Sequence, residues 1–161
     1  MTFDPTEIVR VLDAHGVRYV LIGGFAATVH GAAYVTTDLD ITPDPAPANL
    51  ERLSDALTDL DARVRSPDEP AGLPFAHHAR SPAGAGVWDL VTRAGDLDVS
   101  FVPSGTQGYA DLRRDAVTIT VHGTDVTVAS LADVVRSKEA AGRDKDRAAL
   151  PVLRRLLDEQ A

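Results

Sequence analysis

A short run of apolar residues near the start of the chain stops at two glycines. Residues 17–22 read VRYVLI and are rich in β-branched and aromatic side chains, which predicts a buried strand. Gly23 and Gly24 follow, and residues 25–30 favour a short helix. Two glycines at such a junction let backbone amides approach a phosphate closely. They also suit a simple tight turn between strand and helix. The pair alone therefore leaves both interpretations open.

Two carboxylates lie within the next apolar segment. The expected strand of residues 36–41 contains Asp38 and Asp40, and because side chains alternate along a strand, both carboxylates share one face. Two carboxylates that close are costly to keep ionised unless a cation lies between them. Asp98 lies on a later expected strand, residues 97–102, so neighbouring strands would bring three carboxylates together. Hard divalent cations prefer oxygen ligands of this kind. The alternative is that these aspartates are solvated residues at strand ends.

The rest of the chain predicts a mixture of helices and strands. Helices are expected near residues 4–15, 47–60, 109–114, 130–141 and 144–160, with further strands at 87–92, 97–102, 117–121 and 126–128. Pro151 should kink or interrupt the last helix. Residues 66–86 hold four prolines and three glycines without periodicity, so we expect an irregular loop there. The order predicts an α+β (mixed α/β) fold with helices packed on a mixed sheet.

Length and composition narrow the class of protein further. The 161 residues suit a single domain over 1–161, whose C-terminal segment from about residue 130 is helical. The chain has no cysteine, which excludes disulfides, zinc-thiolate sites and thiol nucleophiles. A net charge of −8 argues against a broad DNA-binding face but permits a local basic site. No signal peptide or transmembrane-length apolar run is visible, so we expect a cytoplasmic protein without a membrane partner.

In combination, the two glycines and the three aspartates resemble a known superfamily. The Gly-Gly turn, the Asp-Leu-Asp-Ile motif and the later strand aspartate are similar to those of the DNA polymerase β-type nucleotidyltransferases. The resemblance implies a nucleotidyltransferase fold in which Gly23 and Gly24 bind the nucleotide. It implies that Asp38, Asp40 and Asp98 are the catalytic and metal-binding residues, holding two Mg²⁺ ions or Mn²⁺. It thus implies an enzyme that transfers a nucleoside monophosphate from an NTP to an acceptor hydroxyl.

The C-terminal part adds a second point of resemblance. Residues 130–153 read SLADVVRSKEAAGRDKDRAALPVL, which is similar to a segment of small stand-alone bacterial nucleotidyltransferases. These include the toxins of abortive-infection and MenA-type toxin–antitoxin systems, so an antitoxin protein is an implied partner. Lys138 shares a helical face with Leu131, Val134 and Val135. It is either a lysine that extends its ammonium to solvent from the core edge or a nucleotide-binding residue.

Several features leave the function open. Relatives often carry an arginine shortly before the Asp-x-Asp motif, and here the matching residue is Tyr34. This departure gives weight to an alternative function, a catalytically weak or inactive module that binds a nucleotide or a partner. If the protein is an enzyme, the acceptor could be an RNA end, a protein or a small molecule such as an aminoglycoside. The acidic net charge favours a cationic acceptor, whereas the C-terminal resemblance favours an RNA end.

Other polar residues have ordinary interpretations. Arg143, Lys145 and Asp146 are expected to be helix-cap or solvated groups. The pair His77-His78 lies in the expected loop and is interpreted as solvated, since no other histidine or cysteine stands at metal-ligand spacing from it.

Overall fold

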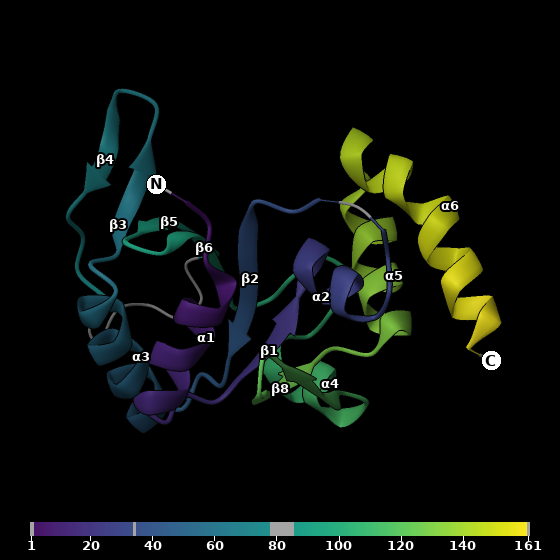
Figure 1. The fold of residues 1–161 in the computed structure, drawn as a ribbon, viewed down its shortest axis with the longest axis horizontal. Helices are drawn as coiled ribbons and strands as arrows, with labels where there is room; N and C mark the ends of the chain where they lie inside the picture. Colours follow the sequence, from purple (N-terminus) through teal and green to yellow (C-terminus); the bar gives the residue numbers. More distant parts are fainter. Residues whose placement is uncertain (1, 34, 78–85, 161) are drawn as a thin grey trace.

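The computed structural model describes residues 2–33, 35–77 and 86–160. Within these ranges the chain forms six helices and one eight-stranded sheet (Figure 1). The helices are α1 (Pro5–Ala14), α2 (Gly23–Val29), α3 (Pro47–Asp59), α4 (Tyr109–Arg114), α5 (Leu131–Ala141) and α6 (Asp144–Glu159). The strands are β1 (Tyr19–Ile22), β2 (Asp38–Pro43), β3 (Arg63–Ser66), β4 (Glu69–Leu73), β5 (Val87–Thr92), β6 (Gly95–Ser100), β7 (Val117–Val121) and β8 (Thr124–Val128). The α+β expectation is confirmed.

The order of the strands places β2 near the middle of the sheet. Among the described residues the order is β4-β3-β5-β6-β2-β1-β8-β7. β2 pairs antiparallel with β1 and parallel with β6, and β1 also pairs parallel with β8. The remaining neighbours are antiparallel. The sheet is therefore mixed, as expected, and its two parallel contacts flank the β1–β2 pair.

Helices α1 and α3 lie on one face of the sheet (Figure 1). Helix α1 begins with Asp4 as its N-cap, whose side chain accepts a hydrogen bond of 3.1 Å from the backbone amide of Glu7. The apolar stripe of α1 is buried, and so are the leucines of α3 that recur at helical spacing. Alternate strand residues such as Leu39 and Leu97 are fully buried in the same core. Because strand side chains alternate, the aspartates between them must project from the opposite face.

The expected loop of residues 66–86 is partly wrong. Its first part belongs to a hairpin made by β3 and β4. The sequence of β4, EPAGL, has no apolar alternation and contains Pro70, so it carries no strand signal. It forms because β4 is the edge strand of the described sheet, where a proline costs little since one side of the strand has no hydrogen-bond partner.

Of the two outcomes expected at Pro151, a kink or an interruption, the interruption does not occur, because α6 runs through Pro151 as one helix. Leu150 and Leu153 on either side of the proline are 6% and 0% exposed. Their burial outweighs the lost backbone hydrogen bond, since packing of an apolar face provides most of a helix's stability in a protein. None of the helices in the described residues is long and apolar enough to cross a membrane.

Candidate functional site

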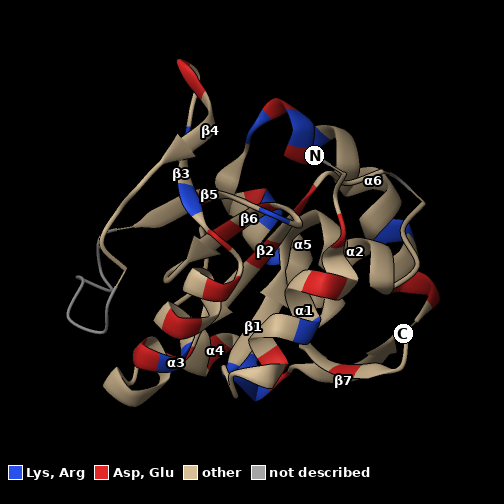
Figure 2. Ribbon diagram, turned by 60° about the vertical axis from the view of Figure 1, so that its left-hand side comes forward, with Lys and Arg blue, Asp and Glu red and all other residues tan. Residues whose placement is uncertain are grey.

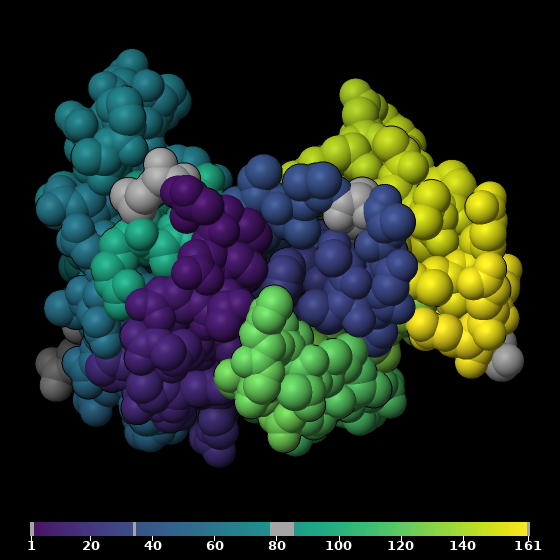
Figure 3. All heavy atoms as spheres, viewed as in Figure 1, coloured from purple at the N-terminus to yellow at the C-terminus, as the bar shows by residue number. Residues whose placement is uncertain are grey.

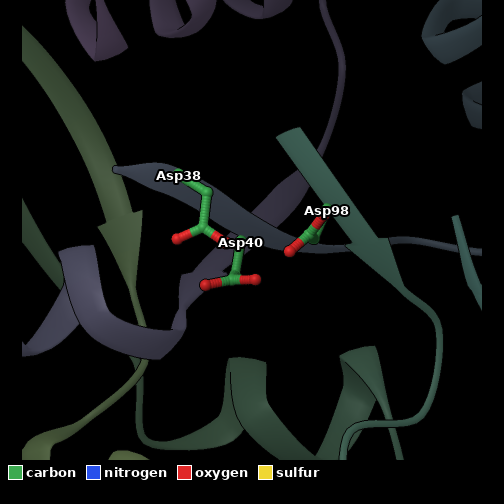
Figure 4. Close-up of side chains that lie close together, drawn as sticks. All are labelled: Asp38, Asp40 and Asp98. Atoms are coloured by element: carbon green, nitrogen blue, oxygen red, sulfur yellow. The ribbon is translucent and has the colours of Figure 1, made fainter. Parts of the chain in front are cut away.

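Three aspartates meet where β2 and β6 run side by side. The parallel register places Asp40 of β2 directly opposite Asp98 of β6. Among the described residues, Asp38, Asp40 and Asp98 each offer a carboxylate oxygen, and these oxygens lie within 4.8 Å of one another. Figure 4 shows the three side chains projecting into the same open space from the two neighbouring strands. The structure thus brings together the three carboxylates that the sequence singled out.

The Gly-Gly turn lies directly against this cluster. Helix α2 begins at Gly23, two residues earlier than the sequence predicted. Gly23 has a φ of +73°, and a Cβ atom on it would lie 2.8 Å from Cγ of Asp40. A residue with a side chain would therefore be strained and would displace the carboxylate. The glycine at this position is needed for the placement of Asp40, a reason that the sequence did not show.

Burial and mutual repulsion raise the pKa of two of the carboxyls. The pKa of Asp40 rises to about 6, first because of burial and then because of the charge of Asp38. The pKa of Asp98 rises to about 8, mainly through burial and then through a hydrogen bond with Asp38 and the charge of Asp40. Without a metal ion, the cluster therefore holds its negative charge at a cost, which is the condition under which a cation binds.

Arg65 is a residue of this site that sequence reasoning missed. It lies on β3, and its Nη2 donates to Oδ1 of Asp98 at 2.8 Å, while its Nε lies 3.5 Å from Oδ2 of Asp96. The same Nη2 donates to the backbone carbonyl of Leu90 at 3.1 Å. The sequence did not predict the β3–β4 hairpin. Without β3, nothing in the sequence indicated that the side chain of Arg65 reaches Asp98 of β6.

The carboxylates lie in a cleft of about 930 Å³. The glycine turn and the three aspartates line it, together with Lys138 of α5, Arg143 at the N-cap of α6 and Lys145 of α6. Figure 2 shows the acidic segments of β2 and β6 near the middle of the molecule and basic segments at the start of α6. In Figure 3 the upper edge of the molecule is hollowed between the β3–β4 hairpin and the start of α6. An acidic strand face is thus opposed by a basic helical wall.

The residues of the α5–α6 region match expectation in part. Lys138 follows the buried Leu131, Val134 and Val135 as predicted, and its side chain is 13% exposed. Arg143 is the N-cap of α6 and Asp146 completes a capping box, as expected of helix-cap groups. Asp146 is nevertheless fully buried rather than solvated, and it accepts from both Lys138 and Arg143. A buried carboxylate between two cations is an organised feature of the site rather than a surface group.

The structure does not bear on two residues that the sequence analysis discussed. Tyr34 and His78 lie outside the described residues. His77 lies next to Ser54 of α3, with its Nδ1 2.9 Å from the hydroxyl oxygen.

Neither the known protein-family profiles nor the curated protein sequences give a match to this chain. Solved structures do resemble it. A Thermotoga maritima protein to which nucleotidyltransferase activity is attributed matches at a TM-score of 0.58 and 17% identity, covering 96% of this chain and 91% of its own. The lincosamide antibiotic adenylyltransferase LnuA, with lincomycin bound, matches at 0.63 and 14%, covering 97% and 99%. The antibiotic-resistance factor ANT(2'')-Ia matches at 0.59 and 13%, covering 92% and 80%. The nucleotidyltransferase fold implied by the sequence is confirmed.

Proposed function

We propose that this protein is a metal-dependent nucleotidyltransferase, which transfers a nucleoside monophosphate from an NTP to an acceptor hydroxyl. The observation that carries the proposal is the convergence of Asp38, Asp40 and Asp98 in a cleft that is also lined by the Gly-Gly turn and by basic residues. Three carboxylates this close repel one another, and Arg65, which pairs with Asp98, balances one of the three charges. The fold supports the same reading.

The residues of the cluster suit a hard divalent ion. The ligand atoms that they offer are all carboxylate oxygens, the donor type that Mg²⁺ and Mn²⁺ prefer over softer metals. The pKa of Asp98 is raised first by burial and then by the neighbouring carboxyls of Asp38 and Asp40. When bound, two such ions would neutralise charge on the triphosphate and lower the pKa of the acceptor hydroxyl.

Different residues of the cleft would bind the triphosphate and accept the proton of the acceptor. The backbone amides of Gly23 and Gly24 and the ammonium groups of Lys138 and Lys145 would bind the triphosphate, where they also offset charge on the leaving group. The acceptor oxygen forms a bond to the α-phosphorus, and the bond from that phosphorus to the bridging oxygen of the β-phosphate breaks. Pyrophosphate leaves, and the proton of the acceptor hydroxyl passes to the carboxylate of Asp98.

A cationic small molecule is the acceptor class that we favour. The net charge of the chain is −8, and an acidic surface attracts cationic molecules in preference to RNA. Val87 and Val102 line the cleft and are 53% and 62% exposed, which suits a partly apolar acceptor. Two of the similar structures are, by their names, a lincosamide antibiotic adenylyltransferase and an antibiotic-resistance factor. The toxin role, with an antitoxin partner, stays a prediction from the C-terminal segment.

The proposal is tested by following the position of a label during transfer. The protein is incubated with Mg²⁺ and each NTP, labelled at the α- or the γ-phosphate, together with aminoglycosides, lincosamides, total RNA or protein. We expect the α-label to appear in an acceptor, with pyrophosphate released in equal amount. Transfer of the γ-label instead would identify a kinase and contradict the proposal. The acceptor that takes up the label decides among small molecule, RNA and protein.

A further inference from the structure

The carboxylate of Asp146 lies behind the basic wall of the cleft and is surrounded by donors. Its side chain is 0% exposed. Oδ1 accepts from Nζ of Lys138 at 3.4 Å and from Nη2 of Arg143 at 3.3 Å. Oδ2 accepts from Nε and from the backbone amide of Arg143, at 2.7 and 3.2 Å. All four acceptor positions of this carboxylate are thus in use, so Asp146 has none left for a metal ion or a substrate.

The partners of Asp146, by contrast, face the cleft. Lys138 and Arg143 both line it, whereas Asp146 is not among the described residues that do. The ammonium of Lys138 has three N–H groups and, within the described part of the chain, donates one of them, to Asp146, which leaves two for a ligand. The three side chains carry a net charge of about +1 when all are ionised. The cluster as a whole therefore presents fixed positive charge toward Asp38 and Asp40.

Capping of α6 alone does not account for this arrangement. Asp146 does complete a capping box at the start of the helix, where it accepts from the backbone amide of Arg143. A cap requires only one such bond. Full burial of a charge is costly unless it is paired and hydrogen-bonded. Here two cationic side chains provide that compensation, and the contact also fixes where they lie.

We infer that Asp146 is a positioning residue that holds Lys138 and Arg143 in place for the triphosphate of the nucleotide. The inference rests on the proposed function, since it assumes a triphosphate in the cleft. Lysine and arginine side chains are flexible, and ordering them on ligand binding costs free energy. A buried carboxylate that orders them beforehand removes that cost from binding. The nucleotide then meets cations that are already directed into the cleft.

The test compares two aspartates at the start of α6. Asp146→Asn removes the buried charge, and Asp144→Asn makes the same change at a side chain that is 96% exposed and paired with Arg147. Binding of inorganic tripolyphosphate and of each NTP is measured by calorimetry at fixed Mg²⁺. Asp146→Asn should weaken binding roughly 10- to 100-fold, the range for a hydrogen bond to a charged group. Asp144→Asn should change it by no more than about twofold, as is usual for surface substitutions.

The direction of the change separates positioning from bulk electrostatics. Removing a negative charge from a phosphate-binding wall should tighten binding if charge alone matters. Tighter or unchanged binding in Asp146→Asn would therefore overturn the inference. Asp146→Glu is the second variant if Asp146→Asn fails to fold: it keeps the charge and moves the carboxylate, so it too should weaken binding. If Asp146→Glu binds tripolyphosphate as tightly as the wild-type protein does, the inference is also overturned.

A double-mutant cycle tests whether Asp146 acts through Lys138. Lys138→Met and Asp146→Asn are made singly and together, and the losses of tripolyphosphate affinity are compared. The combined loss should be clearly smaller than the sum, because the second change removes a contact that is already broken. Additive losses would contradict the inference. If the wild-type protein binds neither tripolyphosphate nor any NTP, the proposed function itself fails. If the wild-type protein binds them and Asp146→Asn binds them equally well, only the inference about Asp146 fails.

Discussion

Gly23 and Asp40 are so closely packed that a Cβ atom on the glycine would lie 2.8 Å from Cγ of the aspartate. The position of the Asp40 carboxylate on β2 therefore depends on the conformation of the turn that follows β1. In the nucleotidyltransferase that we propose, this contact joins the phosphate-binding turn to the metal-binding strand. A change in the turn must disturb the carboxylate, because there is no space between them.

Gly23→Ala should destabilise the protein and impair metal binding together. The left-handed backbone costs about 1–2 kcal/mol for any residue with a side chain, and the displacement of Asp40 adds to it. Gly123→Ala is a matched control, since Gly123 has a φ of +82° but no described heavy atom within 4 Å of the added Cβ. Chemical unfolding and Mn²⁺ titration of both variants check this. Equal losses of stability and of Mn²⁺ affinity in both variants would show that the contact between Gly23 and Asp40 contributes to neither.

Arg65→Met should raise the affinity of the metal-free protein for Mg²⁺. Arg65 contributes positive charge 2.8 Å from Asp98 and so competes with a metal ion. We expect an affinity gain of roughly 3- to 10-fold, consistent with about 1 kcal/mol for a partly exposed ion pair. Arg63→Met is the control: Arg63 lies on the same strand with a similar exposure, 40% against 39%, but pairs with Asp61. A loss of affinity in Arg65→Met would mean instead that Arg65 holds Asp98 in its binding position.

Asp38→Asn should stabilise the protein when no metal is present. The charge of Asp38 is one cause of the raised pKa of Asp40, so its removal relieves repulsion within a buried cluster. We expect the free energy of unfolding at pH 8 in EDTA to rise by about 0.5–1.5 kcal/mol, while the stabilisation by Mg²⁺ is lost. Asp61→Asn, at a side chain 72% exposed, provides the comparison. Lower stability of Asp38→Asn in EDTA would make the cluster a structural feature and contradict the metal site.

Stability without metal should fall as the pH rises. The pKa values of Asp40 and Asp98 are raised from the ordinary value of 3.8 to about 6 and about 8. Between the ordinary pKa of 3.8 and these raised values, the folded state binds more protons than the unfolded state. The free energy of unfolding therefore decreases as the pH rises through this range. The contribution is complete below about pH 4 and is lost through about pH 8. Carboxyls with lowered pKa values, such as Glu7 at about 2, act only at lower pH.

Unfolding in urea at several pH values, with EDTA or with Mg²⁺, measures this dependence. The decline should appear in EDTA and largely disappear with saturating Mg²⁺, because an ion that binds the folded state offsets the repulsion. Asp98→Asn should flatten the decline in EDTA. A rise in stability from pH 5 to pH 8 in EDTA would contradict the raised pKa values of Asp40 and Asp98.

The central part of the site was predictable because strand periodicity carries its geometry. The alternation around Asp38 and Asp40 placed both carboxylates on one face, and the same alternation applied to Asp98. The neighbouring position of β2 and β6 did not follow from this pattern. It came from the resemblance to nucleotidyltransferases, since two strands far apart in sequence give no local signal of their pairing.

The residues around that centre were not predictable from local patterns. Arg65 reaches Asp98 from an edge hairpin whose second strand, with Pro70, lacks a strand signal. Asp146 has the sequence context of a helix cap, and its burial depends on how α5 packs against α6. In both cases the role depends on a tertiary contact, which sequence periodicity does not encode.

The most direct test of the account is whether Asp38, Asp40 and Asp98 hold a divalent metal together with a nucleotide. Mn²⁺ is titrated into the protein with a non-reacting NTP analogue, and the signal of free Mn²⁺ is followed by electron paramagnetic resonance. We predict saturable binding of about two ions in the wild-type protein, weakened at least tenfold in Asp40→Asn and unaffected in Asp61→Asn. Wild-type and Asp40→Asn proteins that bind Mn²⁺ equally, or not at all, would contradict the metal-dependent site.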